Sequence, residues 1–217
     1  MRSSSPKKVD KKKAVKKALI LVDLQNDFLP GGALAVEHGD RILPVIKELE
    51  NKEFDLVIAT KDWHPPDHGS FASVHGRKMG EVIDLFGLPQ ILWPDHCVQG
   101  SPGADFGLNF KKVDKIIHKG VDSKIDSYST FFDNGHLLST GLEDILRKKG
   151  IEEVYFAGLT TEYCVKYSAL DALKLGFQVY VIEDACKAVN LEPGEHERAL
   201  QEMHNAGVHI TRSSDIP

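Results

Sequence analysis

Short hydrophobic runs without polar alternation recur along the chain, and this pattern is typical of strands buried on both faces of a sheet. The clearest run is ALILV at residues 18–22, which Asp23 follows at once. Later runs have a similar length and many β-branched residues. We therefore predict six strands, at residues 18–22, 56–60, 115–118, 154–158, 179–183 and 208–211.

Amphipathic stretches lie between several of these runs and predict helices. Asp40 is the expected N-cap of a helix over 40–52. Glycines are expected to end three further helices, because glycine adopts the left-handed conformation of a C-cap. Alternating strands and helices indicate crossover connections, so the predicted fold is α/β, a three-layer sandwich with a mostly parallel six-stranded sheet and helices on both faces. The three further helices cover 140–149 before Gly150, 162–175 before Gly176 and 194–206 before Gly207.

Residues with chemical potential stand at the predicted strand ends. In open α/β sheets, sites form beyond the carboxyl ends of the strands. Asp23 ends the first strand, Asp62 and His64 follow the second, Lys119 ends the third, and Cys164 follows the fourth. An acid, a lysine and a thiol on one edge of a sheet suit acyl transfer.

Cys164 lies in GLTTEYCVKY, where the predicted helix begins. The N–H groups and the positive end of the helix dipole are expected to lower its pKa and to stabilise the thiolate. The alternative is a small buried side chain without chemistry, since buried cysteines are common. Asp23 could instead be a turn cap, and Lys119 could be an exposed lysine at a strand end. Only the predicted meeting of both residues with Cys164 at one edge of the sheet favours a catalytic role.

The stretch 62–110 is rich in Pro, Gly and His and lacks periodicity, which is typical of a functional loop region. Asp62-Trp63-His64, His68 and the distant His96 provide one carboxylate and several imidazoles. Such a set suits zinc or iron and leaves positions open for water or substrate. Polar surface histidines are the alternative.

Composition and charge narrow the class of protein. The chain has 217 residues and three cysteines, an odd and small number that argues against a disulfide framework. The net charge is −5, although residues 1–17 contain seven Lys, Arg2 and one Asp. We expect a basic disordered tail at 1–17 and one domain at 18–217, with neither a membrane segment nor a nucleic-acid-binding face. The expected location is cytoplasmic, and nuclear entry through the tail is an alternative.

Several separated motifs, in order, resemble those of the nicotinamidases and pyrazinamidases within the isochorismatase-like cysteine hydrolases. The resemblance extends from residue 18 to the last predicted helix. Agreement of many motifs by chance is improbable, whereas one alone is weak. The matching segments are VDLQNDF at 22–28, ATKDWHPPDHGSF at 59–71, WPDHCVQGSPGADF at 93–106, HKGVDSKIDSYSTF at 118–131 and GLTTEYCV at 158–165.

The resemblance implies a role for each matching residue. It makes Asp23, Lys119 and Cys164 a catalytic triad, and it implies a cis peptide bond before Thr160. The backbone N–H groups of Thr160 and Cys164 would form the oxyanion hole. The implied metal ligands are Asp62, His64 and His96, together with His68, whose counterpart binds the metal directly in only some relatives. The implied ring-binding residues are Phe28, Trp93 and Tyr128.

The resemblance also implies the reaction. Nicotinamide would be hydrolysed to nicotinate and ammonia through a thioester on the cysteine, as a step of NAD salvage. The enzyme would bind a divalent metal, for which zinc is the first choice and iron or manganese are alternatives. Alternatives are hydrolysis of another small amide, of a carbamoyl compound or of isochorismate, and a non-catalytic small-molecule binder. A nucleotide binder is disfavoured because VDLQND stands where a G-x-G-x-x-G would follow the first strand. Tolerance of pyrazinamide-like analogues and assembly into a homo-oligomer stay open.

Overall fold

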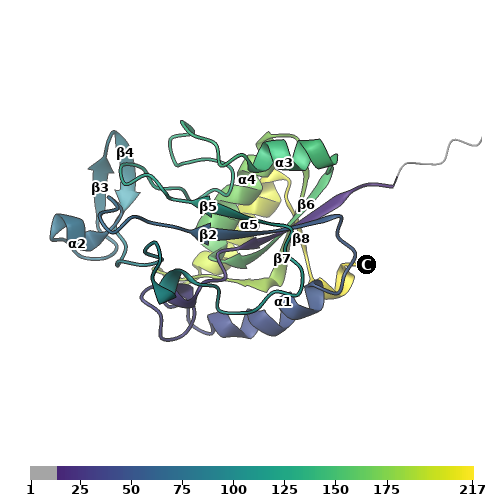
Figure 1. Ribbon diagram of the computed structural model, residues 1–217, viewed down its shortest axis with the longest axis horizontal. Helices are drawn as coiled ribbons and strands as arrows, with labels where there is room; N and C mark the ends of the chain where they lie inside the picture. The colour runs from purple at the N-terminus through teal and green to yellow at the C-terminus, as the bar shows by residue number, and fades with distance from the viewer. Residues whose placement is uncertain (1–13) are drawn as a thin grey trace, which may run out of the picture.

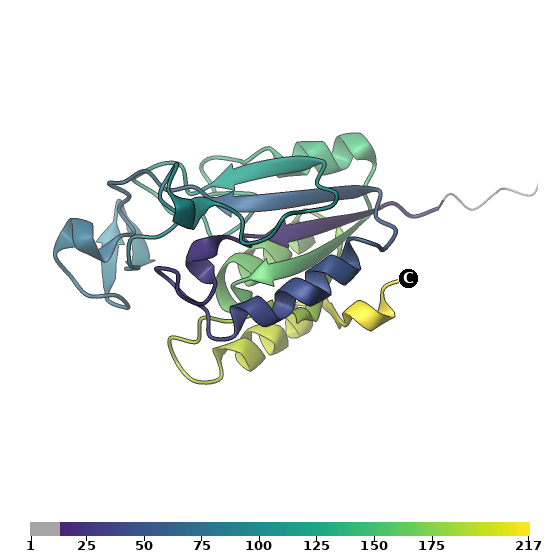
Figure 2. The same cartoon turned by 60° about the horizontal axis from the view of Figure 1, so that its bottom comes forward.

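A six-stranded parallel sheet forms the centre of the protein. The structure is a computed structural model that describes residues 14–217. The strand order is β5-β2-β1-β6-β7-β8, and every neighbouring pair is parallel. Figure 2 shows β5, β2 and β1 side by side in this order. The predicted six-stranded α/β fold is therefore confirmed. The strands are β1 (Lys17–Val22), β2 (Leu56–Asp62), β5 (Lys115–Lys119), β6 (Glu153–Leu159), β7 (Gln178–Lys187) and β8 (His209–Thr211).

Helices cover both faces of the sheet, with α1 on one side and α3, α4 and α5 on the other (Figure 1). Alternate residues of β1 explain this arrangement, because Ile20 packs with the α3–α5 face while Leu19 and Leu21 pack with the α1 face. The central strand is thus hydrophobic on both sides, as its unbroken apolar run predicts. The helices are α1 (Leu43–Leu49), α3 (Leu142–Lys149), α4 (Lys166–Lys174) and α5 (Glu195–Ala206).

The irregular region 62–110 holds structure that the sequence pattern did not predict. A short helix, α2 (Ala72–His75), precedes an antiparallel hairpin of β3 (Val82–Leu85) and β4 (Leu88–Ile91). Figure 1 places this hairpin beyond the carboxyl ends of the main strands. Each of these strands has only four residues, so the alternation of apolar and polar residues is too short to be recognised in the sequence.

Three predicted helix starts differ from the structure. The helix predicted from residue 162 begins as a π-helical turn, Thr161–Val165, and α4 starts only at Lys166. Asp40 does not cap an α-helix: it lies within a 3₁₀ turn, Gly39–Ile42, and α1 begins only at Leu43. The helix predicted from residue 140 begins at Leu142. In contrast, Gly150 and Gly207 end α3 and α5 in the left-handed conformation, as predicted.

Within residues 14–217 no helix is long and apolar enough to cross a membrane. The predicted basic tail at 1–17 falls largely outside the described residues, although Lys17 already begins β1.

Shortening Ile20 tests the central strand. Ile20 is fully buried in β1, so Ile20→Ala should lower the free energy of unfolding by about 2–5 kcal/mol. Ile116→Ala in edge strand β5, where the side chain is 44% exposed, should cost less than about 1 kcal/mol. Urea unfolding monitored by circular dichroism measures both. Equal losses would contradict this packing.

Candidate active site and metal site

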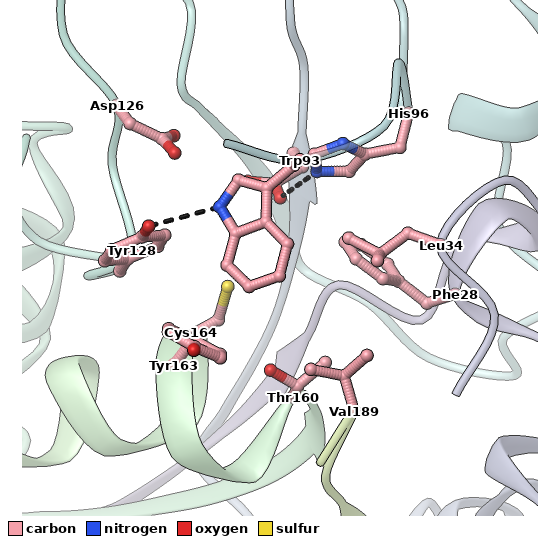
Figure 3. Close-up of a pocket in the computed structure, with 11 residues that line it drawn as sticks. Phe28, Leu34, Trp93, His96, Asp126, Tyr128, Thr160, Tyr163, Cys164 and Val189 are labelled. Carbon is pink, nitrogen blue, oxygen red and sulfur yellow. Dashed lines mark hydrogen bonds and ion pairs between the residues drawn. The ribbon is translucent and has the colours of Figure 1, made fainter. Parts of the chain in front are cut away.

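The predicted catalytic residues converge at the carboxyl edge of the sheet. Asp23 directly follows β1, Lys119 is the last residue of β5, and Cys164 lies in a π-helical turn, Thr161–Val165, after β6. All three side chains are buried. Figure 3 shows Sγ of Cys164 pointing into a pocket. Adjacent parallel strands end at one edge, and this brings together residues distant in sequence.

The ammonium group of Lys119 joins the other members of the site. Its Nζ lies 2.9 Å from Oδ2 of Asp23 and 3.3 Å from Sγ of Cys164, and it also contacts Oδ1 of Asp62. It donates a further hydrogen bond of 3.0 Å to the carbonyl of Ser127. A buried ammonium is stable only when anionic or carbonyl oxygens surround it, and these contacts meet that need.

The two carboxyl groups beside Lys119 differ in acidity. Burial and repulsion by Asp62 raise the pKa of Asp23, although Lys119 and the hydroxyl of Thr60 oppose this rise. Burial would also raise the pKa of Asp62, but Lys119 and His64 outweigh it and hold that pKa well below its usual value. Asp62 is therefore a permanent anion, whereas Asp23 can exchange a proton more readily.

Cys164 behaves differently from the expectation of a lowered pKa. Burial raises the pKa of its thiol well above the usual value, and the anions Asp23 and Asp62 add to the rise. Lys119 acts in the opposite direction without reversing it. The prediction of a lowered pKa was therefore wrong for this resting state, because desolvation and the two carboxyl groups outweigh the attraction of Lys119. The thiol must therefore pass its proton to a neighbouring base when it reacts.

The backbone around the nucleophile has the geometry that the resemblance implies. The peptide bond between Leu159 and Thr160 is cis. Thr160 is the residue before the π-helical turn, and its carbonyl accepts hydrogen bonds from the N–H groups of Tyr163 and Val165.

Two histidines have the tautomer that a metal requires. Nδ1 of His64 is 2.8 Å from the carbonyl of Gly120, and Nδ1 of His96 is 2.7 Å from that of Pro94. A carbonyl only accepts, so each Nδ1 carries the hydrogen and each Nε2 keeps its lone pair. The Nε2 atoms lie 3.6 and 3.7 Å from Oδ2 of Asp62. Asp62, His64 and His96 thus fit a divalent metal.

His68 lies beside this group, and Ser70 contacts its Nδ1 twice. The hydroxyl Oγ of Ser70, which can donate or accept, lies 2.7 Å from Nδ1 of His68, and the backbone N–H of Ser70 lies 3.2 Å from the same atom. Burial lowers the pKa of His68 to about 4, and its buried Nε2 has no hydrogen-bond partner within residues 14–217. His68 forms a second group of possible metal ligands with His64 and Asp126, so its role as a ligand stays a prediction.

Glycine is required at position 120 beside the metal-binding group. Gly120 has φ +63°, and a Cβ there would lie 2.4 Å from Cε1 of His64. Any other residue would be strained and would push the imidazole away.

Aromatic side chains form the walls of the pocket. Phe28, Trp93 and Tyr128 all line it together with Cys164, as expected of ring-binding residues. Nε1 of Trp93 donates to the hydroxyl of Tyr128 over 3.2 Å, and this bond fixes both rings (Figure 3). The walls suit a flat aromatic molecule, because rings pack through their faces and edges.

Sequence reasoning missed other residues of the pocket. Leu34, Asp126, Tyr163 and Val189 line it but were not proposed. Tyr163 directly precedes Cys164, and Asp126 lies two residues before Tyr128. Their positions inside the matching motifs could have identified both as pocket residues. Val189 belongs to the segment after β7 and lies near the cysteine only through the fold.

Metal affinity should fall in acid, because His64 must lose a proton to bind. Burial would lower the pKa of His64, but Asp62 outweighs burial and raises that pKa, so protonation competes with metal binding as the pH falls. The zinc dissociation constant, from competition with a chromogenic chelator, should rise up to about tenfold per pH unit below that pKa. His64→Asn should weaken binding at all pH values, whereas His204→Gln on α5 should not. Affinity independent of pH down to about pH 5 would contradict this assignment.

Comparisons with known proteins agree with this geometry. The family model described as "Isochorismatase domain" matches residues 17–215. The nicotinamidase of Escherichia coli (strain K12) is 48% identical over 204 residues, which cover 92% of this chain and 96% of that protein. The solved structure of an Acinetobacter baumanii nicotinamidase pyrazinamidase superposes with a TM-score of 0.89 at 45% identity, over 95% of this chain and 100% of that one. A pyrazinamidase of Pyrococcus horikoshii, solved in complex with zinc, has a TM-score of 0.76 at 42% identity, over 91% and 99%. The chain therefore belongs to the isochorismatase family.

Proposed function

We propose that this chain is an amidohydrolase that converts nicotinamide to nicotinate and ammonia. The observation that carries the proposal is the contact of Lys119 with both Asp23 and Cys164 in a pocket with aromatic walls. Such a group suits attack of a thiolate on a carboxamide. Three relatives that are 38–48% identical and match 91–92% of the chain are named nicotinamidases, which supports this substrate and a place in NAD salvage.

The first half of the reaction forms a thioester. Asp23 accepts the proton of Cys164, and Sγ attacks the carboxamide carbon of nicotinamide. The N–H groups of Thr160 and Cys164 stabilise the oxyanion. The C–N bond then breaks, and Asp23 returns its proton to the leaving nitrogen, which departs as ammonia. Lys119 keeps Asp23 and the sulfur in place and offsets the negative charge that passes between them.

The second half restores the thiol. A water molecule gives a proton to Asp23 and attacks the thioester carbon, and the C–S bond breaks. Nicotinate is released and the sulfur regains a proton from Asp23. Each cycle therefore consumes one water and leaves Asp23, Lys119 and Cys164 in their starting states.

A divalent metal held by Asp62, His64 and His96 would supply a Lewis acid that binds the ring nitrogen and so orients the carboxamide. Zinc is our choice, because two imidazoles and a carboxylate suit it and the Pyrococcus horikoshii structure contains it. Phe28, Trp93 and Tyr128 would hold the ring. We also propose that residues 18–217 form one hydrolase domain and that the protein acts in the cytoplasm.

Another small amide is the alternative substrate. The metal-binding group favours nicotinamide over a carbamoyl compound, since a pyridine nitrogen binds a metal and an aliphatic amide has no such atom. A purified enzyme that releases ammonia from other amides faster than from nicotinamide would refute our choice.

Replacing the sulfur tests the chemistry. Cys164→Ala should lower kcat by at least about 10⁴-fold, because no other group in the pocket can form the thioester. Ammonia release, measured with a coupled enzyme assay, reports the rate. Cys186→Ala removes another buried thiol, in β7, and should leave kcat within about twofold. Retained turnover in Cys164→Ala would exclude Cys164 as nucleophile.

The hydroxyl of Thr60 offers a test of Asp23. It donates to Oδ1 of Asp23 over 2.6 Å and lowers the pKa of that carboxyl group. Thr60→Val should raise the pKa of Asp23, so the acid limb of kcat/KM against pH should move to higher pH, because the base is active only when ionised. Thr211→Val in β8 is the control. A limb that stays in place, or moves to lower pH, would contradict the role of Asp23 as the base.

A further inference from the structure

Glu162 is a buried acidic residue in the nucleophile turn that the reaction does not use. It lies two residues before Cys164, and only 4% of its surface is exposed. Within residues 14–217 none of the ion pairs includes Glu162, and its Oε2 has no hydrogen-bond partner. A buried carboxylate without a cation is costly, so its retention needs a physical reason.

The partner of Glu162 is a backbone N–H group of the segment after β7. The N–H of Asn190, the residue after Val189, donates to Oε1 of Glu162 over 2.8 Å. Bonds from N–H groups to a charged acceptor are stronger than bonds between neutral groups. Glu162 therefore ties the nucleophile turn to the segment around Val189.

His196 of α5 contacts both the nucleophile turn and this segment. Nδ1 of His196 lies 3.1 Å from the hydroxyl of Thr161, which is the neighbour of Glu162. Asn190 has φ +50°, an unusual conformation for a residue other than glycine, and its side chain accepts from the N–H of His196. Asparagine tolerates this conformation better than most residues, and the hydrogen bond to His196 stabilises it here. The path of the chain through Val189 and Asn190 is thus set by the nucleophile turn and by α5.

Val189 connects the hydrogen bond of Glu162 to the substrate pocket. Its side chain lines the pocket beside Thr160, and Cys164 lies on the same side (Figure 3). The free volume of the pocket is about 20 Å³, close to that of a single water, so small shifts of a wall decide whether a ring is admitted. The distance between the Val189 wall and the sulfur then depends on Glu162.

We propose that Glu162 is a positioning residue that fixes the Val189 wall of the substrate pocket relative to Cys164, and so sets which ring-substituted carboxamides the pocket accepts. The inference rests on the proposed hydrolysis of nicotinamide but concerns selection of the substrate. Glu162 touches neither the substrate nor the reacting atoms, and its effect passes through the backbone of Val189 and Asn190.

Kinetics of two substitutions test the tie. Glu162→Ala removes the bond to the N–H of Asn190, so KM for nicotinamide should rise about tenfold while kcat stays within about threefold, because the triad is intact. The preference for nicotinamide over a methyl-substituted nicotinamide, measured as a ratio of kcat/KM values, should shrink. Glu162→Gln keeps one acceptor oxygen and should restore most of both values. Glu197→Ala, an exposed acid on α5, is the matched control and should change neither.

Hydrogen exchange provides a readout that does not depend on turnover. The amides of Val189 and Asn190 should exchange at least about tenfold faster in Glu162→Ala than in the parent and in Glu197→Ala. A fall in kcat with unchanged KM, or unchanged exchange at these two amides, would overturn the role of Glu162. Failure of the parent protein to hydrolyse nicotinamide would instead overturn the proposed function and leave the exchange result valid.

Discussion

The buried ammonium group of Lys119 is the interaction on which the site depends. It contacts two carboxylates and a sulfur atom at once, at a place with almost no access to water. Removing it would leave Asp23 and Asp62 as neighbouring buried anions that repel each other. One positive charge therefore holds the base, the nucleophile and a metal-binding carboxylate within contact distance, and it allows the thiol proton to move without an uncompensated charge.

The parallel sheet supplies the positions for this cluster. β1, β2, β5 and β6 end at one edge, and each strand end contributes or precedes one reacting or ligating side chain. The hairpin region then closes over this edge and provides Trp93 and His96. The different pKa values of Asp62 and Asp23 assign them different roles. Lys119 and His64 hold Asp62 ionised for metal binding, whereas Asp23 has a raised pKa and can act as the base in proton transfer.

Local pattern succeeded where a residue's environment follows from its neighbours in sequence. The six strands, the parallel sheet and the C-caps Gly150 and Gly207 were predicted correctly, because burial on both faces and left-handed caps have strong local signals. Asp40 failed as a cap because packing set a 3₁₀ turn before α1. The expected low pKa of Cys164 failed because it counted the helix dipole and omitted desolvation.

The sequence by itself determined the fold class, the strand ends and the chemical types of residue that meet there. The hydrophobic pattern of short segments predicts each strand and helix, and the alternation of strands with helices predicts a parallel sheet. Only the tertiary structure decided the acidities of Asp23 and Cys164 and the tautomers of His64 and His96. It also decided the place of Val189 beside the nucleophile turn. These properties depend on distances of a few ångströms between side chains far apart in the chain, and electrostatic and hydrogen-bond energies change steeply over such distances.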